Sequence, residues 1–191
     1  ALPSDVELID SVVQEYLIDD QGGIMDPIGM VGIRLELELL LLTGKRPYLK
    51  NMEAVLERSN LKMERRFVGL VGAGELVLKS DEKELGTVLI DFGAETLNVG
   101  IWHSGRLVYM MVLGYGSELV TRDIATVLKL PRDEAEKIKV DYGLAITSLA
   151  DDGEDVEILG VGGRDKRVLS RKLLAEVIET RLDELFTMVR N

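Results

Sequence analysis

Cysteine is absent from the 191 residues of this chain, and histidine occurs once, at His103. Without cysteine, the chain can form neither a disulfide nor a thiolate metal site. A single histidine excludes most histidine-based metal centres and leaves no spare residue for a His-dependent catalytic triad. The absence of cysteine suits the cytosol, and His103 is expected to be an exposed residue of a hairpin turn.

Long hydrophobic runs are also missing. The leucine-rich run Leu37–Leu42 is interrupted by Glu38, whereas a helix needs about 20 apolar residues to span a bilayer. The opening residues ALPSDVELID have neither a basic stretch nor an apolar core, so we expect no signal peptide there. The chain is 46% hydrophobic and 30% charged, which is typical of a globular protein.

Positive charge is scarce. The chain has 23 Lys and Arg against 34 Asp and Glu, a net charge of −11, and such a chain is repelled by nucleic acid phosphates unless it carries a local basic patch. The one basic segment, Arg164–Lys172, is expected to be a solvated loop and helix start. Nucleic acid is therefore excluded as the main partner.

The first block of the chain, up to about Arg66, has the pattern of a small α/β unit. Within Gly32–Thr43, every second residue from Ile33 to Leu41 is apolar, and the residues between them are charged as far as Glu38. This alternation predicts a half-buried strand whose leucine face is covered. Further elements expected in or just after this block are a short strand at Glu15–Asp19, a turn-rich stretch at Asp20–Gly29, a helix at Tyr48–Ser59 and a strand at Phe67–Val71.

The second block has the pattern of a sheet followed by helices, so the fold class is α/β. A short helix that runs into the charged loop KSDEKEL is expected at Ala73–Glu84, and a hairpin turn at His103–Gly105. Ser117 is expected to cap the helix that follows, and Pro131 to open another that stops at Gly143. The strands are expected at Thr87–Ile90, Thr96–Trp102, Arg106–Val112 and Asp155–Val161, and the helices at Glu118–Lys129, from Pro131, and from Ser170 onward.

The turn in LIDFGAETLNVGI, between the first two of these strands, holds Asp91, Gly93 and Thr96. Backbone N–H groups of a tight glycine-containing turn can bind a phosphate, and a threonine hydroxyl adds a donor. An aspartate at the strand end can hold a hydrated Mg²⁺ that neutralises the phosphates. The alternative is a plain hairpin turn in which Asp91 bonds nearby backbone N–H groups.

A family resemblance supports the phosphate interpretation. The pattern Asp-x-Gly-x-x-Thr between two strands, followed by a third strand and a Gly-x-Gly helix start, resembles the second phosphate motif of the actin, heat-shock chaperone and sugar-kinase superfamily. Longer stretches resemble the FtsA family of bacterial cell-division proteins: QEYLID, DPIGMVGIRLE, AVLERSNLK, DEKELGTVLIDFGAETLNVGI, VTRDIATVLKLPRDEAEKIKVDYG and VGGRDKRVLSRKLLAEVIETRLDEL.

The resemblance implies an actin-like (ribonuclease H-like) ATPase fold with the α/β subdomain 1C of that family, and it covers about the middle half of such a protein. Residues 1–66 would be subdomain 1C, 67–84 the last strand and connecting helix of 1A, 85–152 subdomain 2A, and 153–191 the start of 2B. The family's amphipathic membrane helix lies outside this stretch, so membrane contact is expected only through a helix absent from the chain.

The same resemblance implies a site for ATP and Mg²⁺. Asp91 would hold Mg²⁺, and Gly93, Ala94, Glu95 and Thr96 would wrap the phosphate tail, which requires the Glu95 side chain to point outward. Lys172 and Glu176 would touch adenine and ribose; the alternative for this pair is a solvated helix face.

In function, the resemblance implies a protein that binds ATP, polymerises and links FtsZ filaments to the inner face of the cell membrane at the division site. Arg181 and Glu184, otherwise a simple i,i+3 ion pair, would contact the carboxy-terminal peptide of FtsZ, and the 1C-like block would meet other divisome proteins. Residues Val71–Gly74 offer no side chain to orient an attacking water, so little or no ATP turnover is expected.

Two other functions are kept open. One is a pilus-assembly ATP-binding protein similar to PilM, although LAEVIETR and IKVDYG favour FtsA. The other is a sugar-kinase-type phosphotransferase, for which neither a catalytic aspartate nor a sugar pocket is visible.

Overall fold

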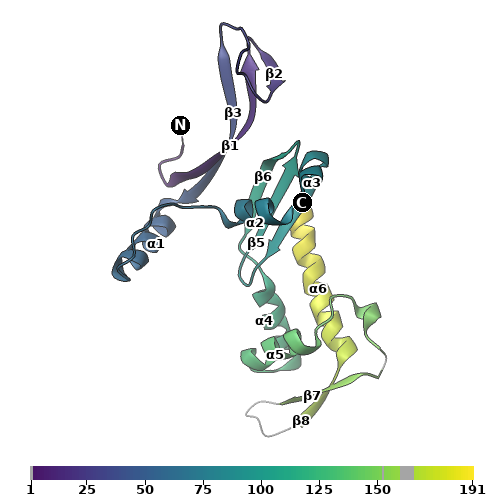
Figure 1. Cartoon of the computed structure of the whole chain (residues 1–191). Helices are drawn as coiled ribbons and strands as arrows, with labels where there is room; N and C mark the ends of the chain where they lie inside the picture. The colour runs from purple at the N-terminus through teal and green to yellow at the C-terminus, as the bar shows by residue number, and fades with distance from the viewer. Residues whose placement is uncertain (1, 152, 160–165) are drawn as a thin grey trace. The chain divides into compact units, whose positions relative to one another are not determined.

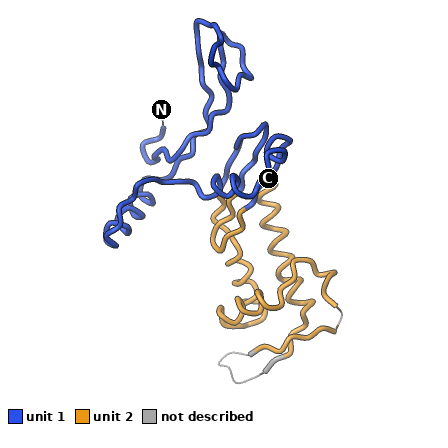
Figure 2. Tube along the Cα trace, in the orientation of Figure 1, with its two compact units in different colours: residues 1–90, 99–111 blue, residues 91–98, 112–191 orange. Residues whose placement is uncertain are grey.

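The computed structural model describes residues 2–151, 153–159 and 166–191, and the chain divides into two compact units (Figures 1 and 2). Unit 1 comprises residues up to 90 and 99–111; unit 2 comprises 91–98 and 112–191. The described strands are β1 (Val6–Ile18), β2 (Gln21–Ile24), β3 (Leu35–Lys45), β4 (Thr87–Phe92), β5 (Leu97–His103), β6 (Arg106–Leu113), β7 (Asp155–Leu159) and β8 (Lys166–Ser170). The described helices are α1 (Arg46–Arg58), α2 (Gly69–Val77), α3 (Ser80–Leu85), α4 (Ser117–Leu128), α5 (Arg132–Tyr142), the 3₁₀ turn η1 (Thr147–Leu149) and α6 (Arg171–Arg190).

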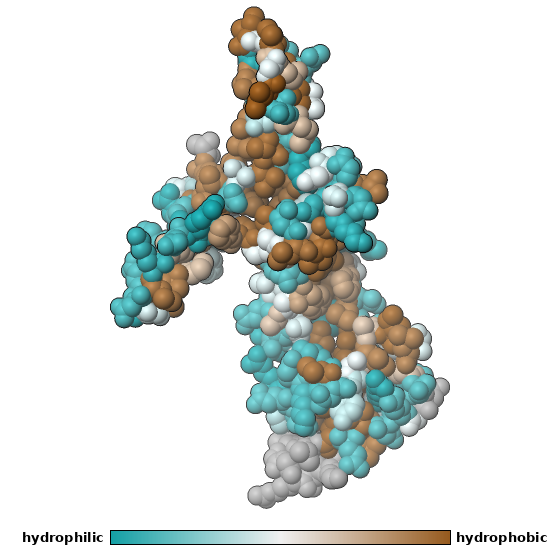
Figure 3. Space-filling view, viewed as in Figure 1, coloured by the Kyte–Doolittle hydropathy of each residue, from teal (hydrophilic) through white to brown (hydrophobic). Residues whose placement is uncertain are grey.

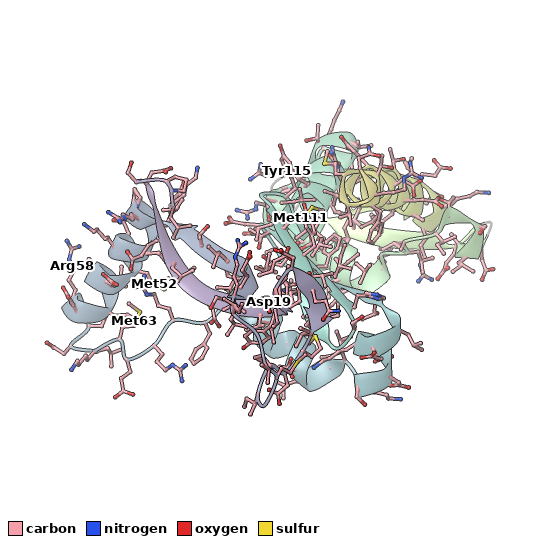
Figure 4. All side chains as sticks on the ribbon, turned by 90° about the horizontal axis from the view of Figure 1, so that it is seen from above. Asp19, Met52, Arg58, Met63, Met111 and Tyr115 are labelled. Carbon is pink, nitrogen blue, oxygen red and sulfur yellow. The ribbon has the colours of Figure 1, made fainter. Side chains whose placement is uncertain are left out.

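A long antiparallel pair of strands, β1 with β3, dominates the first part of unit 1, and β2 pairs with the far end of β1. The predicted short strand at Glu15–Asp19 is wrong in extent, because β1 has 13 residues. Register shifts interrupt the pairing of β1 with β3 at two points, and such irregularities break the alternation of apolar and polar residues by which a strand is recognised. The carboxylate of Asp19, labelled in Figure 4, accepts hydrogen bonds from the N–H groups of Ile33 and Arg34, which joins the two chain segments beyond the end of the β1–β3 pair.

The leucine face of β3 is exposed, contrary to the sequence-based expectation. Leu35, Leu37, Leu39 and Leu41 are each 38–61% exposed, and apolar residues are visible along these strands in Figure 3. The buried residue of the strand is Leu42, which is on the opposite face and belongs to a core cluster with Leu70, Trp102 and Leu107. The alternating pattern gave the strand correctly but not the face that is covered.

The segment after α1 differs from the prediction. Instead of a strand at Phe67–Val71, the helix α2 begins at Gly69, and Phe67 is exposed. The short helix expected within Ala73–Glu84 corresponds to α2, but the charged loop expected at KSDEKEL is wrong. The helix α3 forms there, after extended backbone at Leu78 and Lys79. A short apolar run fits a buried strand or a buried helix equally well, and periodicity alone cannot decide between them.

The three-stranded sheet β4-β5-β6 confirms the predicted strands, and the β5–β6 hairpin turn is also confirmed. Ser104 and Gly105 both have positive φ values, 49° and 78°, as a two-residue type I′ turn requires.

Unit 2 is built around α4, α5 and α6, with the hairpin β7–β8 beside them. Its core includes Ile124, Ile138, Leu174 and Ile178, so the predicted apolar stripe of the final helix is confirmed. Two expected helix starts are shifted by one residue: Gly116 is the N-cap of α4, and Pro131 the N-cap of α5. Residues 160 and 161 of the predicted seventh strand, and 164 and 165 of the basic segment, lie outside the described residues.

Within the described part of the chain, no helix has both the length and the apolar character needed to cross a bilayer.

Candidate functional site

The turn predicted to bind phosphate lies in unit 2 and is open to solvent. It joins the end of β4 to the start of β5, and it is closed by a hydrogen bond of 2.9 Å from the Gly93 N–H to the Thr96 carbonyl. Ala94, Glu95 and Thr96 are all exposed. The turn is therefore not packed shut within its unit.

Two carbonyl groups of the turn, those of Gly93 and Ala94, are bound to the amino-terminal end of α4. The Ser117 N–H donates to the Gly93 carbonyl at 3.0 Å, and the Glu118 N–H donates to the Ala94 carbonyl at 2.8 Å. These donors are first-turn N–H groups of α4, which have no acceptor inside the helix. The turn and the helix thus satisfy each other's backbone groups.

The N–H groups of the turn face the other way. In a trans peptide the C=O and the following N–H point in opposite directions, so the N–H groups of Ala94 and Glu95 point away from α4. Neither finds a hydrogen-bond acceptor among the described residues. Two adjacent N–H groups without a partner in a tight, exposed turn are suited to donating to an anion.

Asp91 lies at the end of β4, exposed, and its carboxylate accepts a hydrogen bond of 3.0 Å from the side-chain amide of Asn98 on β5. The alternative in which Asp91 bonds neighbouring backbone N–H groups is not seen in the described residues. A carboxylate has about four acceptor positions, so Asp91 retains capacity for a cation.

The described residues contain no group of three or more His, Cys, Asp and Glu side chains that could hold a metal ion by themselves. Mg²⁺ keeps several waters and is held through one or two carboxylates together with substrate phosphates. A lone carboxylate beside an exposed turn with two unpaired N–H groups therefore fits Mg²⁺ that arrives with a phosphate.

The end of β4 is fixed to α6 by an aromatic contact. The rings of Phe92 and Phe186 lie 6.2 Å apart between centroids, inclined at 56°, an arrangement typical of aromatic pairs. This contact anchors the residue between Asp91 and Gly93.

A polar cluster that was not predicted joins α4 to α5. Thr121 is fully buried, and its hydroxyl lies 2.5 Å from Glu136 Oε2 and 2.9 Å from Lys139 Nζ. Lys139 also pairs with Glu136 at 2.6 Å, and the hydrogen bonds from Lys139 and Thr121 hold the pKa of Glu136 below its usual value. The sequence could have indicated the pair of Glu136 and Lys139, because the Glu-x-x-Lys spacing in AEKIK places both side chains on one face of a helix.

Lys172 and Glu176 lie in the first two turns of α6, Lys172 half-buried and Glu176 exposed. Phe186, which contacts Phe92 next to the turn, follows Glu176 by ten positions, or about 15 Å along a helix. The assignment of these residues to adenine and ribose stays a prediction.

Arg181 and Glu184 form the expected i,i+3 ion pair. Arg181 also pairs with Asp123 of α4, a partner that the sequence did not reveal, and its side chain is 23% exposed. The hydrogen bond that Arg181 donates to Asp123 is the main reason that the pKa of Arg181 lies above its usual value. Arg181 is thus part of the contact between α4 and α6.

Unit 1 contains a groove. A groove of about 650 Å³ lies between α1 and the segment that follows it, and Met52 and Met63 (Figure 4) both line it, with Leu49, Leu56 and Phe67. Its charged residues are Lys62, Glu64, Arg65 and Arg66, and none of the predicted site residues is among its lining.

Comparison with protein families identifies two regions of the chain. Residues 88–188 match the model of the cell division protein FtsA. Residues 1–43 match the model of the SHS2 domain inserted in FtsA.

Curated relatives match over almost the whole chain. The cell division protein FtsA of Neisseria meningitidis is 37% identical over 188 residues, which is 98% of this chain and 45% of the relative. The FtsA of Pseudomonas aeruginosa is 38% identical over 190 residues, 100% of this chain and 46% of the relative. The chain therefore spans about half the length of the curated relatives it matches.

Among solved structures, the PilM–PilN type IV pilus biogenesis complex contains a chain that superposes with a TM-score of 0.63 at 16% identity, over 99% of this chain and 45% of that one. At that identity the likeness concerns the fold alone.

Proposed function

We propose a function on the basis that this chain belongs to the FtsA family of cell division proteins. The chain forms part of a protein that binds ATP and Mg²⁺. That protein assembles and tethers FtsZ filaments at the division site. The observation that carries the nucleotide part is the open turn Gly93–Thr96. The carbonyls of Gly93 and Ala94 are bound to α4, while the N–H groups of Ala94 and Glu95 are unpaired within the described residues.

In this proposal the turn binds the phosphate tail of the nucleotide. The N–H groups of Ala94 and Glu95 donate to phosphate oxygens, and the exposed hydroxyl of Thr96 adds a third donor. Asp91, oriented by Asn98 at 3.0 Å, holds Mg²⁺ through its remaining acceptor positions. The cation offsets the charge of the phosphates and of the exposed carboxylate of Glu95.

The nucleotide is proposed to act as a ligand that promotes assembly, with little or no hydrolysis. Residues Val71–Gly74 lack a side chain that could orient water, and the nearby Glu75 is paired with Lys83 at 2.8 Å. Lys172 and Glu176 are proposed for adenine and ribose.

Titration with Mg-ATP tests the nucleotide site, with affinity measured on the wild type and on Asp91→Ala. Loss of a charge-assisted contact is worth about 1.5–3 kcal/mol, or roughly a tenfold or greater loss of affinity. Asp141→Ala, which removes an exposed aspartate of α5 in the same unit, is the matched control and should bind as the wild type does. Equal affinity of all three proteins would remove Asp91 from the site.

The proposed assembly role has two surfaces. Arg181 and Glu184 on α6 are assigned to the carboxy-terminal peptide of FtsZ. The block 1–66, proposed as subdomain 1C, is assigned to other divisome proteins and to neighbouring copies in a filament. The location at the inner face of the cell membrane is proposed to depend on a helix outside this chain.

Co-sedimentation with FtsZ filaments tests the first surface, with FtsZ lacking its terminal peptide as the negative control. Arg181→Ala should reduce peptide-dependent pelleting. Because Arg181 also bonds Asp123, Asp123→Asn separates the two roles: it disturbs the helix contact but keeps the arginine. If both variants lose pelleting equally, the loss reflects helix packing and not peptide recognition. ATP hydrolysis stimulated by sugars would instead support the phosphotransferase alternative.

A further inference from the structure

We propose that Gly116, together with the first turn of α4, holds the turn Gly93–Thr96 in its anion-binding conformation, so that Gly116 is a positioning residue for phosphate. The inference deepens the proposed nucleotide site and rests on it.

The direction of two N–H groups depends on two hydrogen bonds. Ser117 and Glu118 hold the carbonyls of Gly93 and Ala94 at 3.0 and 2.8 Å. If either hydrogen bond opens, the peptide plane that carries its carbonyl is free to rotate. The N–H on the other side of that plane then no longer points toward the proposed phosphate position. The shape of the turn is thus set by α4 and not by the turn alone.

Gly116 permits this close approach because it has no side chain. A Cβ at Gly116 would lie 2.5 Å from the carbonyl oxygens of both Gly93 and Ala94. That separation is below any normal carbon–oxygen contact, and both oxygens belong to backbone. An alanine here must therefore push the turn away from α4.

The helix cannot easily retreat, because α5 holds its first turn. The buried hydroxyl of Thr121 has one proton; it donates to Glu136 at 2.5 Å and accepts from Lys139 at 2.9 Å. Lys139 also reaches the Ser117 carbonyl at 3.5 Å. A side chain at position 116 is therefore expected to displace the exposed turn and not the helix.

The neighbouring Gly114 supplies a matched control. A Cβ at Gly114 meets no atom within 4 Å, and its φ is not positive. Gly114→Ala and Gly116→Ala therefore make the same chemical change two residues apart, and only the second collides with the turn.

The test is an NMR titration of the ¹⁵N-labelled chain with magnesium pyrophosphate, following the amide signals of Ala94 and Glu95, with adenosine as a second probe. Wild type and Gly114→Ala should bind pyrophosphate alike, and Gly116→Ala at least tenfold more weakly. Adenosine should not distinguish the three proteins, because it carries no phosphate; a general loss of structure would affect both probes.

Thr121→Val keeps the buried volume but removes the hydroxyl, so it supplies a second route to the same effect if Gly116→Ala does not fold. It should weaken pyrophosphate binding at least threefold. Unchanged pyrophosphate affinity in the folded variants would overturn the positioning role while leaving the nucleotide site standing. Absence of pyrophosphate binding in the wild type would overturn the phosphate site and, with it, the role of Gly116.

Discussion

Gly74 on α2 lies directly against the indole ring of Trp102 on β5: a Cβ at this position would be 2.3 Å from Cζ2 of the ring. Trp102 is 2% exposed and belongs to the core of unit 1. We predict that Gly74→Ala destabilises the chain by about 1–3 kcal/mol, because an added methyl group in a packed core forces neighbours out of place. Urea denaturation followed by tryptophan fluorescence measures it.

The control for this prediction is Gly72→Ala, on the same helix, where a Cβ would meet nothing within 4 Å. Alanine is favoured over glycine in a helix by about 1 kcal/mol, so this variant should be as stable as the wild type or more stable. Equal destabilisation by the two substitutions would show that the contact with Trp102 is not the cause.

Gly74 also illustrates what the sequence could and could not predict about the fold. The strands β4, β5 and β6 and the helices α4, α5 and α6 were found from apolar periodicity and turn residues, since each has a regular pattern bounded by clear signals. The pairing of Gly74 with Trp102 is a contact between residues far apart in the chain, and no local pattern encodes it. The same holds for Leu42: alternation shows that β3 has two faces, but the packing against Leu70 and Trp102 decides which is buried.

The candidate site was predictable in part for a similar reason. Asp91, Gly93 and Thr96 stand together in the sequence, so a motif could reveal them. Gly116 is brought against the turn by folding, from a position after β6, and Thr121 of the same helix bonds Glu136 of α5. The Gly-x-Gly start of α4 was visible as a helix start, but its close contact with Gly93 and Ala94 required the structure.

The cluster of Glu136, Lys139 and Thr121 predicts a pH dependence. Its hydrogen bonds lower the pKa of Glu136 in the folded chain, so the stabilisation is present above the pKa of the unfolded state and is lost as pH falls through the lower folded pKa. Glu136→Gln should be less stable than the wild type at pH 7, and the difference should shrink between about pH 5 and pH 3.

Urea denaturation at several pH values measures this difference. Asp133→Asn, which removes an exposed acid of the same helix, is the control and should not share the effect. A gap between wild type and Glu136→Gln that stays constant down to pH 3 would contradict the assignment of the lowered pKa to this cluster.

The pair Arg181–Asp123 predicts a coupling between α4 and α6. Both side chains are less than one-third exposed, and Arg181 is shared with Glu184. Removal of one member leaves the other partly buried without its partner, so Arg181→Ala should destabilise the chain by about 1–3 kcal/mol. A double-mutant cycle with Asp123→Ala should give a coupling energy of at least about 0.5 kcal/mol; purely additive effects would show that the ion pair contributes nothing to helix packing.

The carboxyl end of α4 offers a stabilising substitution. Lys129, the C-cap residue, has φ 52° and ψ 53°, the left-handed conformation that favours glycine. Lys129 is exposed, so Lys129→Gly removes the backbone strain without loss of a buried contact. We expect a gain in unfolding free energy of up to about 1 kcal/mol, reduced by the greater flexibility of glycine in the unfolded chain.

Lys137→Gly, at an exposed interior position of α5, should instead lower stability by about 1 kcal/mol. Opposite signs for the two lysine-to-glycine changes in urea denaturation would establish the left-handed cap, whereas equal losses would exclude it.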